Sequence, residues 1–147
     1  MKPFQMPAAV FAAVLMSASP PWAQTPSQPQ LQTQTVERAA KGQPGKDIQV
    51  GIYLNVQPDC TSGPLPSIRL LKPPEHGKVA VKKAKLSATN YKQCLALEVP
   101  GFIAFYRSAA DFVGSDVILL EVKYQGGRVE LQKITVTVVS SAPVQRI

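Results

Sequence analysis

Two apolar, β-rich runs joined by a short polar corner constrain the fold of this chain more than any other feature. Both runs lie within residues 101–124, and residues 108–116 form the corner between them. Each run has the length and the β-branched or aromatic composition of a strand in a sandwich core. The corner offers the aromatic ring of Phe112, a glycine free to take a positive φ in Gly114, and a carboxylate in Asp116 that can accept hydrogen bonds from backbone amides. We therefore expect this corner to carry the chain from one sheet to another.

Further strands are predicted on both sides of this pair. Apolar residues occupy every second position over most of residues 47–56, which is the pattern of a strand with one buried face. The other candidate strands are separated by loops and turns rich in proline and glycine, and they cover residues 66–71, 78–86, 93–99 and 128–139. Helical periodicity of useful length is missing, and fourteen prolines in 147 residues argue against long helices. About seven strands in residues 47–140 favour an all-β fold, an antiparallel sandwich of the immunoglobulin type.

Local signals set the ends of several of these strands. The alternation slips at Lys82 and Lys83, which predicts a bulge or the end of the strand. Residues 87–92 are expected to form a loop. Pro100-Gly101 is expected to end the strand before it, so that residues 93–99 and the apolar run that follows are separate strands.

Both ends of the chain are expected to lie outside the folded domain. Residues 1–23 have the pattern of a secretory signal peptide, with a positive start at Lys2, an apolar run and a cleavage site after Ala23. The run is too short and too interrupted by proline to span a bilayer permanently, so we expect no membrane span after cleavage. Residues 24–46 are rich in Gln, Thr and Pro, which predicts a disordered linker with at most a marginal helix over residues 34–41. Residues 141–147 are expected to form a flexible tail.

Cys60 and Cys94 are the only cysteines of the chain. Two cysteines in an exported protein most often pair, and closing a loop of about 35 residues contributes roughly 3–4 kcal/mol of stability in the chain-entropy estimate. The alternatives are a redox couple or a metal site, but a Cys-x-x-Cys motif is absent and two thiols with one histidine make a poor zinc shell. We therefore predict a structural disulfide between the loop after the first strand and the fourth strand, in a periplasmic or secreted protein.

Several short motifs follow one another in the second half of the chain. A Pro-x-His-Gly turn opens a hairpin, a strand ends in Tyr, and Phe-x-Gly-x-Asp leads into an apolar strand. These positions are Pro74, His76, Gly77, Tyr106, Phe112, Gly114 and Asp116. With these motifs the chain resembles, over about residues 48–139, the cadherin-like, immunoglobulin-fold repeats of bacterial surface and secreted proteins. The resemblance implies an Ig-like or cadherin-like sandwich and, for function, adhesion with calcium bound at domain junctions.

The candidate catalytic and metal-binding residues also have structural interpretations. His76, the only histidine, could titrate near neutral pH in a catalytic or metal site, but in a Pro-x-His-Gly turn it is expected to cap or pack on the hairpin. Asp111 and Asp116 could form half of a calcium site, but a third and a fourth acid are missing nearby, which favours corner hydrogen bonds, above all for Asp116. The sequence has no Gly-x-Ser-x-Gly elbow and no phosphate-binding glycine loop. We expect no catalytic residue, no metal, no cofactor and no enzymatic activity.

The densest group of basic residues in this chain of net charge +7 is made up of Lys78, Lys82, Lys83 and Lys85. The four lysines could bind a phosphate-bearing glycolipid or an acidic polysaccharide. They could equally guard an exposed strand edge against unwanted pairing, without any ligand. Nucleic acid is not an expected partner, because the chain is predicted to be exported and aromatic residues do not interleave the lysines.

The sequence therefore predicts a non-enzymatic, exported β-sandwich module that binds or supports a cell-envelope partner, either an anionic component or another envelope protein. Its expected working surface is the lysine-bearing strand or the loops at one end of the sandwich. Two alternatives stay open, a calcium-dependent module of adhesin type and a small accessory subunit of a periplasmic enzyme. Calcium dependence predicts a melting temperature that rises with added calcium. The enzyme alternative predicts a deep pocket that places His76 against Glu75, Glu98 or Asp59.

Overall fold

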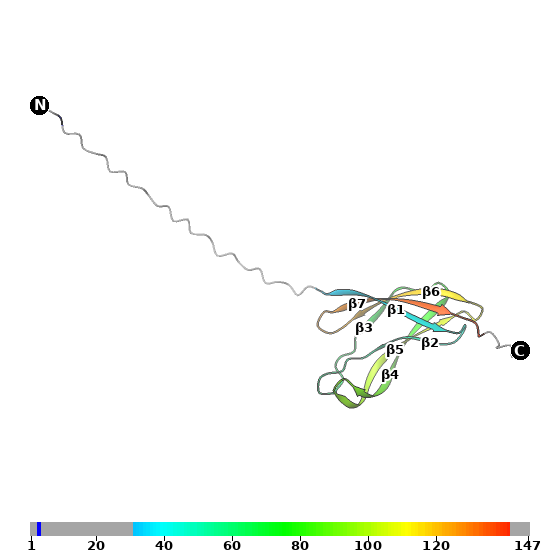
Figure 1. The fold of residues 1–147 in the computed structure, drawn as a ribbon, viewed down its shortest axis with the longest axis horizontal. Coiled ribbons are helices and arrows are strands. Elements are labelled where there is room, and N and C mark those ends of the chain that lie inside the picture. The colour runs from blue at the N-terminus through cyan, green and yellow to red at the C-terminus, as the bar shows by residue number, and fades with distance from the viewer. Residues whose placement is uncertain (1–2, 4–30, 142–147) are drawn as a thin grey trace.

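The computed structural model describes Pro3 and residues 31–141, and the described residues form an all-β protein of two sheets (Figure 1). One sheet has the strand order β1-β7-β6-β3 and the other has the order β2-β5-β4. The strands are β1 (Thr33–Gly42), β2 (Ile48–Tyr53), β3 (Ser67–Lys72), β4 (Gly77–Tyr91), β5 (Cys94–Ser108), β6 (Gly114–Lys123) and β7 (Val129–Val138). The expected signal peptide apart from Pro3, the first part of the expected linker and nearly all of the expected tail lie outside the described residues.

The strand β1 corrects the prediction of a disordered linker over residues 24–46 and of a marginal helix over residues 34–41. It pairs in parallel with β7 along its whole length, from Thr33 opposite Val129 to Gly42 opposite Val138. Only Val36, Ala40 and Gly42 of this strand are half-buried, and its other residues are exposed. Backbone pairing with the distant strand β7 stabilises β1. Its side chains show no alternation of apolar and polar residues, so the sequence alone gives no pattern that predicts this strand. The other neighbouring strands pair antiparallel, as predicted.

The core lies between the two sheets and is built largely from alternating side chains. On β6 and β7 the even-numbered residues from 118 to 122 and from 134 to 138 are buried, and they pack against Tyr53, Ala104 and Tyr106 of the other sheet. The chain crosses from the second sheet to the first between the end of β5 and the start of β6. The predicted corner therefore does carry the chain from one sheet to the other.

β4 and β5 form one long hairpin rather than the three shorter strands that were predicted. Residues 87–92 belong largely to β4, and Pro100-Gly101 lies inside β5. β2 pairs with β5 only from Phe102 to Tyr106, so Pro100 lies where β5 has one free edge, a position that proline tolerates. The β4–β5 register is unbroken through Lys82 and Lys83, so the predicted bulge is absent from this part of the hairpin.

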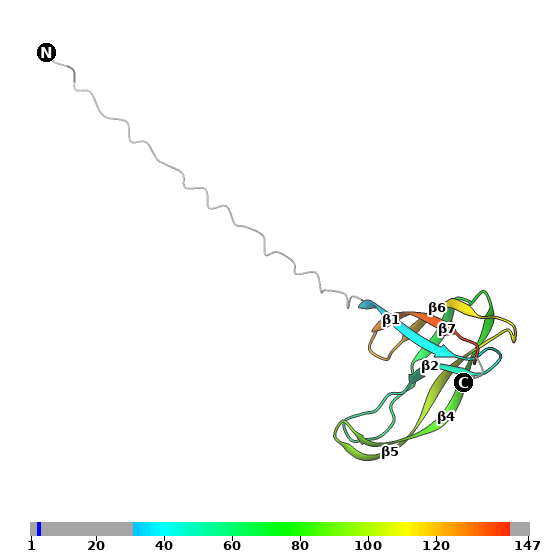
Figure 2. The same ribbon diagram turned by 45° about the vertical axis from the view of Figure 1, so that its right-hand side comes forward.

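The slip in alternation at Lys82 and Lys83 instead marks a change of buried face. Before it, Val79 and its partner Tyr106 face the other sheet and join the main core. After it, Leu97 and Val99, which lie on the opposite face of the hairpin, are the buried residues. Both views show this half of the hairpin, which we call the arm (residues 84–101), extending away from the body of two sheets (Figures 1 and 2).

A small second core and the disulfide fix the arm. The loop after β2 covers one face, where Val56 and Cys60 pack against Cys94, Leu97 and Val99. Cys60 and Cys94 form the disulfide, with their Cα atoms 5.8 Å apart. The predicted pairing is therefore confirmed, and it ties the loop after β2 to the start of β5.

Candidate binding surface on the β4–β5 hairpin

Asp116 is the centre of the motif that suggested a known family. Its Oδ1 accepts hydrogen bonds from the amides of Glu75 (2.9 Å) and Val117 (3.0 Å). Its Oδ2 accepts hydrogen bonds from the amide of His76 (2.8 Å) and the hydroxyl of Tyr106 (3.0 Å). The prediction that Asp116 bonds to backbone amides is confirmed. We call these residues together with Phe112 the Asp116 cluster.

These four hydrogen-bond donors stabilise the buried carboxylate of Asp116 in its ionised form. The residue is 4% exposed, and its burial opposes ionisation. The hydrogen bonds donated by Glu75, His76, Tyr106 and Val117 outweigh that effect and lower the pKa of the carboxyl. Burial and the hydrogen bond to Asp116 raise the pKa of Tyr106, so this tyrosine stays a neutral donor. The Asp116 cluster therefore joins the turn before β4, the end of β5 and the start of β6.

The other motif residues also stabilise this connection between the turn before β4, the end of β5 and the start of β6. The imidazole of His76 stacks on the ring of Phe112, with centroids 4.2 Å apart, so the predicted packing of His76 on the hairpin is confirmed. A Cβ at Gly77 would lie 2.5 Å from the carbonyl oxygen of Arg107, which explains why a glycine opens β4 behind Pro74. Gly114 takes a φ of +144°, a value that L side chains rarely adopt.

Of the three acids that an enzymatic role would require, only Glu75 forms an ion pair with His76, and this pair is exposed. Its nearest carboxylate among them is Glu75, with 4.0 Å between His76 Nε2 and Glu75 Oε2, and the side chains of both residues are largely exposed. Glu98 lies on the arm and pairs with Lys85, while Asp59 accepts hydrogen bonds from Thr61 in the loop after β2. Among the described residues no group of three or more His, Cys, Asp or Glu could hold a metal ion, and both oxygens of Asp116 are already hydrogen-bonded.

The four predicted lysines all lie on β4, but they do not form one patch. Successive residues of a strand point to opposite faces, and the β4–β5 register is unbroken here. Lys78 and Lys82 therefore lie on the face of the sheet that points away from the core, opposite Arg107 and Ile103 of β5. Lys83 and Lys85 lie on the other face, in the part of β4 where the arm begins.

The outward face of the sheet β2-β5-β4 combines positive charge with apolar surface. The cations Lys78, Lys82 and Arg107 surround Phe105, and Lys82 Nζ lies 5.3 Å from the centre of that ring. Ile52 is 44% exposed and pairs with Ile103 beside Phe105. We call this surface the outer face; its residues are Asp47, Ile52, Lys78, Lys82, Ile103, Phe105 and Arg107.

Asp47 orders two of the three cations of the outer face. Its Oδ1 accepts a hydrogen bond from Arg107 Nε at 2.8 Å, and its Oδ2 lies 4.0 Å from Lys82 Nζ. The hydrogen bond from Arg107 lowers the pKa of the Asp47 carboxyl. All three side chains remain substantially exposed, so the pairs contribute little to stability and leave Arg107 and Lys82 open to a ligand.

Arg107, Asp47 and Phe105 were not among the predicted site residues. The sequence could have indicated two of them, because the two-residue period of a strand places Phe105 and Arg107 on one face. A hairpin that begins at Gly77 then sets Lys78 opposite Arg107. The alternation of β4 likewise shows that four lysines spread over consecutive positions cannot share a face.

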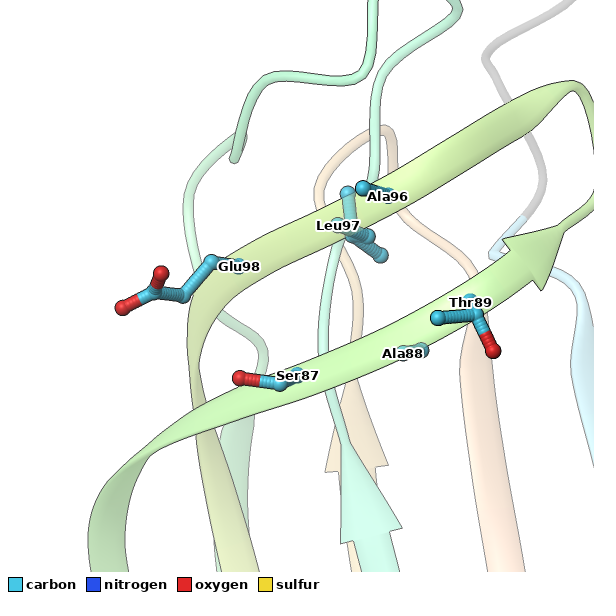
Figure 3. A pocket seen from close by; sticks show the side chains of 6 residues that line it. All are labelled: Ser87, Ala88, Thr89, Ala96, Leu97 and Glu98. Carbon is cyan, nitrogen blue, oxygen red and sulfur yellow. The ribbon is translucent and has the colours of Figure 1, made fainter.

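A shallow pocket lies on the arm and is lined by β4 and β5 alone (Figure 3). It has a volume of about 430 Å³. Figure 3 shows the Glu98 side chain extending away from the hairpin, and this carboxylate pairs with Lys85 at 2.7 Å. The lining residues are Ser87, Ala88, Thr89, Ala96, Leu97 and Glu98. Small side chains, rather than a set of reacting groups, thus characterise this pocket.

A buried polar network between the sheets was also missed by sequence reasoning. Tyr53 donates a hydrogen bond to Gln132 Oε1 at 2.7 Å, and Gln132 Nε2 donates to Glu130 Oε2 at 2.8 Å. Arg128 Nη1 lies 3.2 Å from Glu130 Oε1 and compensates its charge. Burial raises the pKa of Tyr53 to about 12, so its hydroxyl remains a donor. Gln132 shares the buried parity of Ile134 on β7, which is the signal that could have revealed the network.

Comparisons with protein-family models, with curated proteins and with solved structures give no match to this chain. In the part of the chain that the structure describes, no helix has the length and apolar character needed to cross a membrane.

Proposed function

We propose that this protein is a non-enzymatic, exported β-sandwich module that binds an anionic component of the cell envelope through its outer face. The observation that carries the proposal is the exposure of Lys78, Lys82 and Arg107 around Phe105 on one face of the sheet β2-β5-β4. Cations supply attraction to phosphate, sulfate or carboxylate groups, and the arginine adds a bidentate donor. Neither the core nor the disulfide needs these side chains, since they point away from the other sheet.

The strand arrangement supports an immunoglobulin-like or cadherin-like sandwich as the scaffold. Apart from β1, the sheets β7-β6-β3 and β2-β5-β4 have the neighbour relations of the strands GFC and BED of immunoglobulin domains. β1 then takes the place of a first strand that pairs with the last one. Such a scaffold places functional groups on its faces, edges and loops without constraining what they bind.

The disulfide supports export to a periplasmic or extracellular site. Disulfides persist in oxidising compartments and are rare in the cytosol, and this one joins a loop to a projecting arm that has a small core of its own. The apolar run within residues 1–23, with Lys2 before it, is the expected export signal.

The test measures retention of residues 24–147 on phosphatidylglycerol vesicles and on heparin resin across a salt series. A variant with Lys78, Lys82 and Arg107 changed to Ser is compared with a control in which Lys72, Lys83 and Lys85 are changed to Ser. The two variants lose the same charge, so net charge alone predicts equal elution. We expect the outer-face variant to elute at clearly lower salt than the control.

The two supports distinguish a lipid headgroup from an acidic glycan as the source of the anion. Equal retention of both variants on both supports would refute the outer face as the binding site. Retention of neither the native chain nor the variants on either support would refute an anionic partner altogether.

A further inference from the structure

The sandwich is closed along one side and open along the other. Next to the β1–β2 turn, the edge strands β1 and β2 lie in contact. On the opposite side the edge strands are β3 and β4, and their core-facing residues are incompletely covered. Leu70 shares the inward parity of Ile68 on β3 yet is 40% exposed, and Val81 shares that of Val79 on β4 yet is 43% exposed.

An apolar groove occupies this opening. It has a volume of about 440 Å³ and lies where the chain enters β3, beside β4 and β5. The groove is lined by Leu65, Pro66, Ser67, Ile68, Val81 and Phe102. Large apolar side chains that point inward but remain exposed mark a place where a further strand could cover the sandwich.

The free edge of β4 runs along the same opening. β4 is the last strand of its sheet and pairs with β5 alone. Among the described residues, no backbone hydrogen bond outside that ladder involves residues 78–91. The outward N–H and C=O groups of this long strand are therefore a template for a further strand.

Charge selects the kind of strand that could add to this edge. Lys78, Lys82 and Lys83 place positive charge on both faces of β4 beside Val81. A second copy of β4 in parallel register would set each lysine directly opposite its counterpart, which is destabilising. In an antiparallel pair centred on Val81, Lys82 would lie diagonally across from Lys78 and Lys82 of the copy, within reach of these long side chains. A strand with acidic residues opposite Lys82 and Lys83 would instead gain cross-strand pairs on both faces.

We propose that the free edge of β4 binds an extended segment of a partner protein by strand addition, with an apolar side chain seated in the groove beside Val81 and acidic residues opposite Lys82 and Lys83. The cross-strand neighbour of Val81 points to the same face as Val81, so it enters the groove. Backbone hydrogen bonds supply affinity, while the groove and the lysines supply specificity. This surface shares Lys82 with the outer face, but it depends mainly on other atoms, namely the backbone edge of β4 and the side chain of Val81.

The experiment uses two synthetic peptides with residues 24–147 of the protein. Thr-Glu-Glu-Leu-Thr-Val-Glu-Thr suits an antiparallel partner of β4, and the reverse sequence suits a parallel one. We expect one of them to bind in fluorescence anisotropy, and Val81→Lys to weaken its binding at least about tenfold by filling the groove with a charge. Leu95→Lys, at an 81% exposed apolar residue of the arm, is the matched control and should leave binding unchanged.

Versions of the binding peptide that are N-methylated at Leu or at the Thr next to it test the strand geometry. Alternate amides of a strand point to opposite edges, so one methyl group should abolish binding and the other should not. Equal effects of the two methyl groups, equal binding to Val81→Lys and the native chain, or binding of neither peptide would overturn the proposal. So would sedimentation showing that the native chain pairs with itself and that Val81→Lys does not, because the occupant would then be a second copy.

Discussion

Replacing Asp116 by Asn should destabilise the protein far more than its single lost charge suggests. The carboxylate accepts four hydrogen bonds, two at each oxygen. In the better orientation of the substituted side chain, its amide nitrogen replaces Oδ2, and the hydroxyl of Tyr106 can rotate to accept from it. The backbone amide of His76 is then left without an acceptor in a part-buried site. An orphaned donor costs about 1–3 kcal/mol, and the loss of charge assistance in the remaining bonds adds to it, for a total of about 3 kcal/mol.

The assay is urea unfolding of the native chain, of Asp116→Asn and of Asp111→Asn. Asp111 lies in the same corner, is exposed, and loses the same charge on substitution, so it is the matched control. We expect Asp111→Asn to change the free energy of unfolding by less than about 0.5 kcal/mol. Similar values for the two variants would refute the role of the Asp116 cluster as a structural joint.

The difference in the free energy of unfolding between the native chain and Asp116→Asn should depend on pH in a defined direction. The pKa of Asp116 is lowered in the folded protein, so its ionised form stabilises the fold above the pKa of the unfolded chain, about 3.9. This stabilisation is lost as pH falls through the lower pKa of the folded state. The gap between the native chain and Asp116→Asn should therefore be full at neutral pH and shrink below about pH 4. A gap that stays constant down to pH 2 would contradict the ionised state of Asp116.

Three further perturbations test other parts of the fold. Changing Cys60 and Cys94 to Ser together should lower the free energy of unfolding by roughly 3–4 kcal/mol in urea titrations, and a reducing agent should match this loss in the native chain and leave the double variant unchanged. A chain that begins at residue 46 lacks β1, so it should lose about 1–2 kcal/mol of apolar burial and self-associate in sedimentation through the uncovered edge of β7; unchanged stability and a monomer would argue against β1. Tyr53→Phe should cost about 1–3 kcal/mol in thermal or urea unfolding because it leaves Gln132 Oε1 without its donor, and a neutral effect would contradict the buried network.

The core strands could be predicted because their own side chains carry the pattern. Residues of β6 and β7 alternate between a buried face and a more exposed one, and this alternation is visible in the sequence without knowledge of their partners. In β2 the predicted alternation holds only at its start, because a bulge between Gln49 and Gly51 turns Tyr53 inward and leaves Ile52 exposed. The disulfide and the role of Asp116 followed from local chemistry, namely two cysteines in a chain predicted to be exported and a carboxylate in a corner rich in backbone donors.

The features that were missed depend on partners that are distant in sequence. β1 is defined by its parallel pairing with β7, on residues nearly a hundred positions away, and its exposed polar side chains have the composition of a linker. The continuity of β5 through Pro100 depends on the end of β2, which leaves that edge free. The division of the lysines between the two faces of β4 could have been predicted from the sequence, because it requires only the two-residue period of a strand.

The most direct measurement on the proposed function is a nuclear magnetic resonance titration of isotope-labelled residues 24–147 with a heparin oligosaccharide. The outer face predicts the largest shift changes at the amides of Lys78, Lys82, Phe105 and Arg107, with smaller changes along the sheet β1-β7-β6-β3. Largest changes at Lys83 and Lys85, or on the sheet that contains β7, would contradict the outer face as the binding surface of this protein.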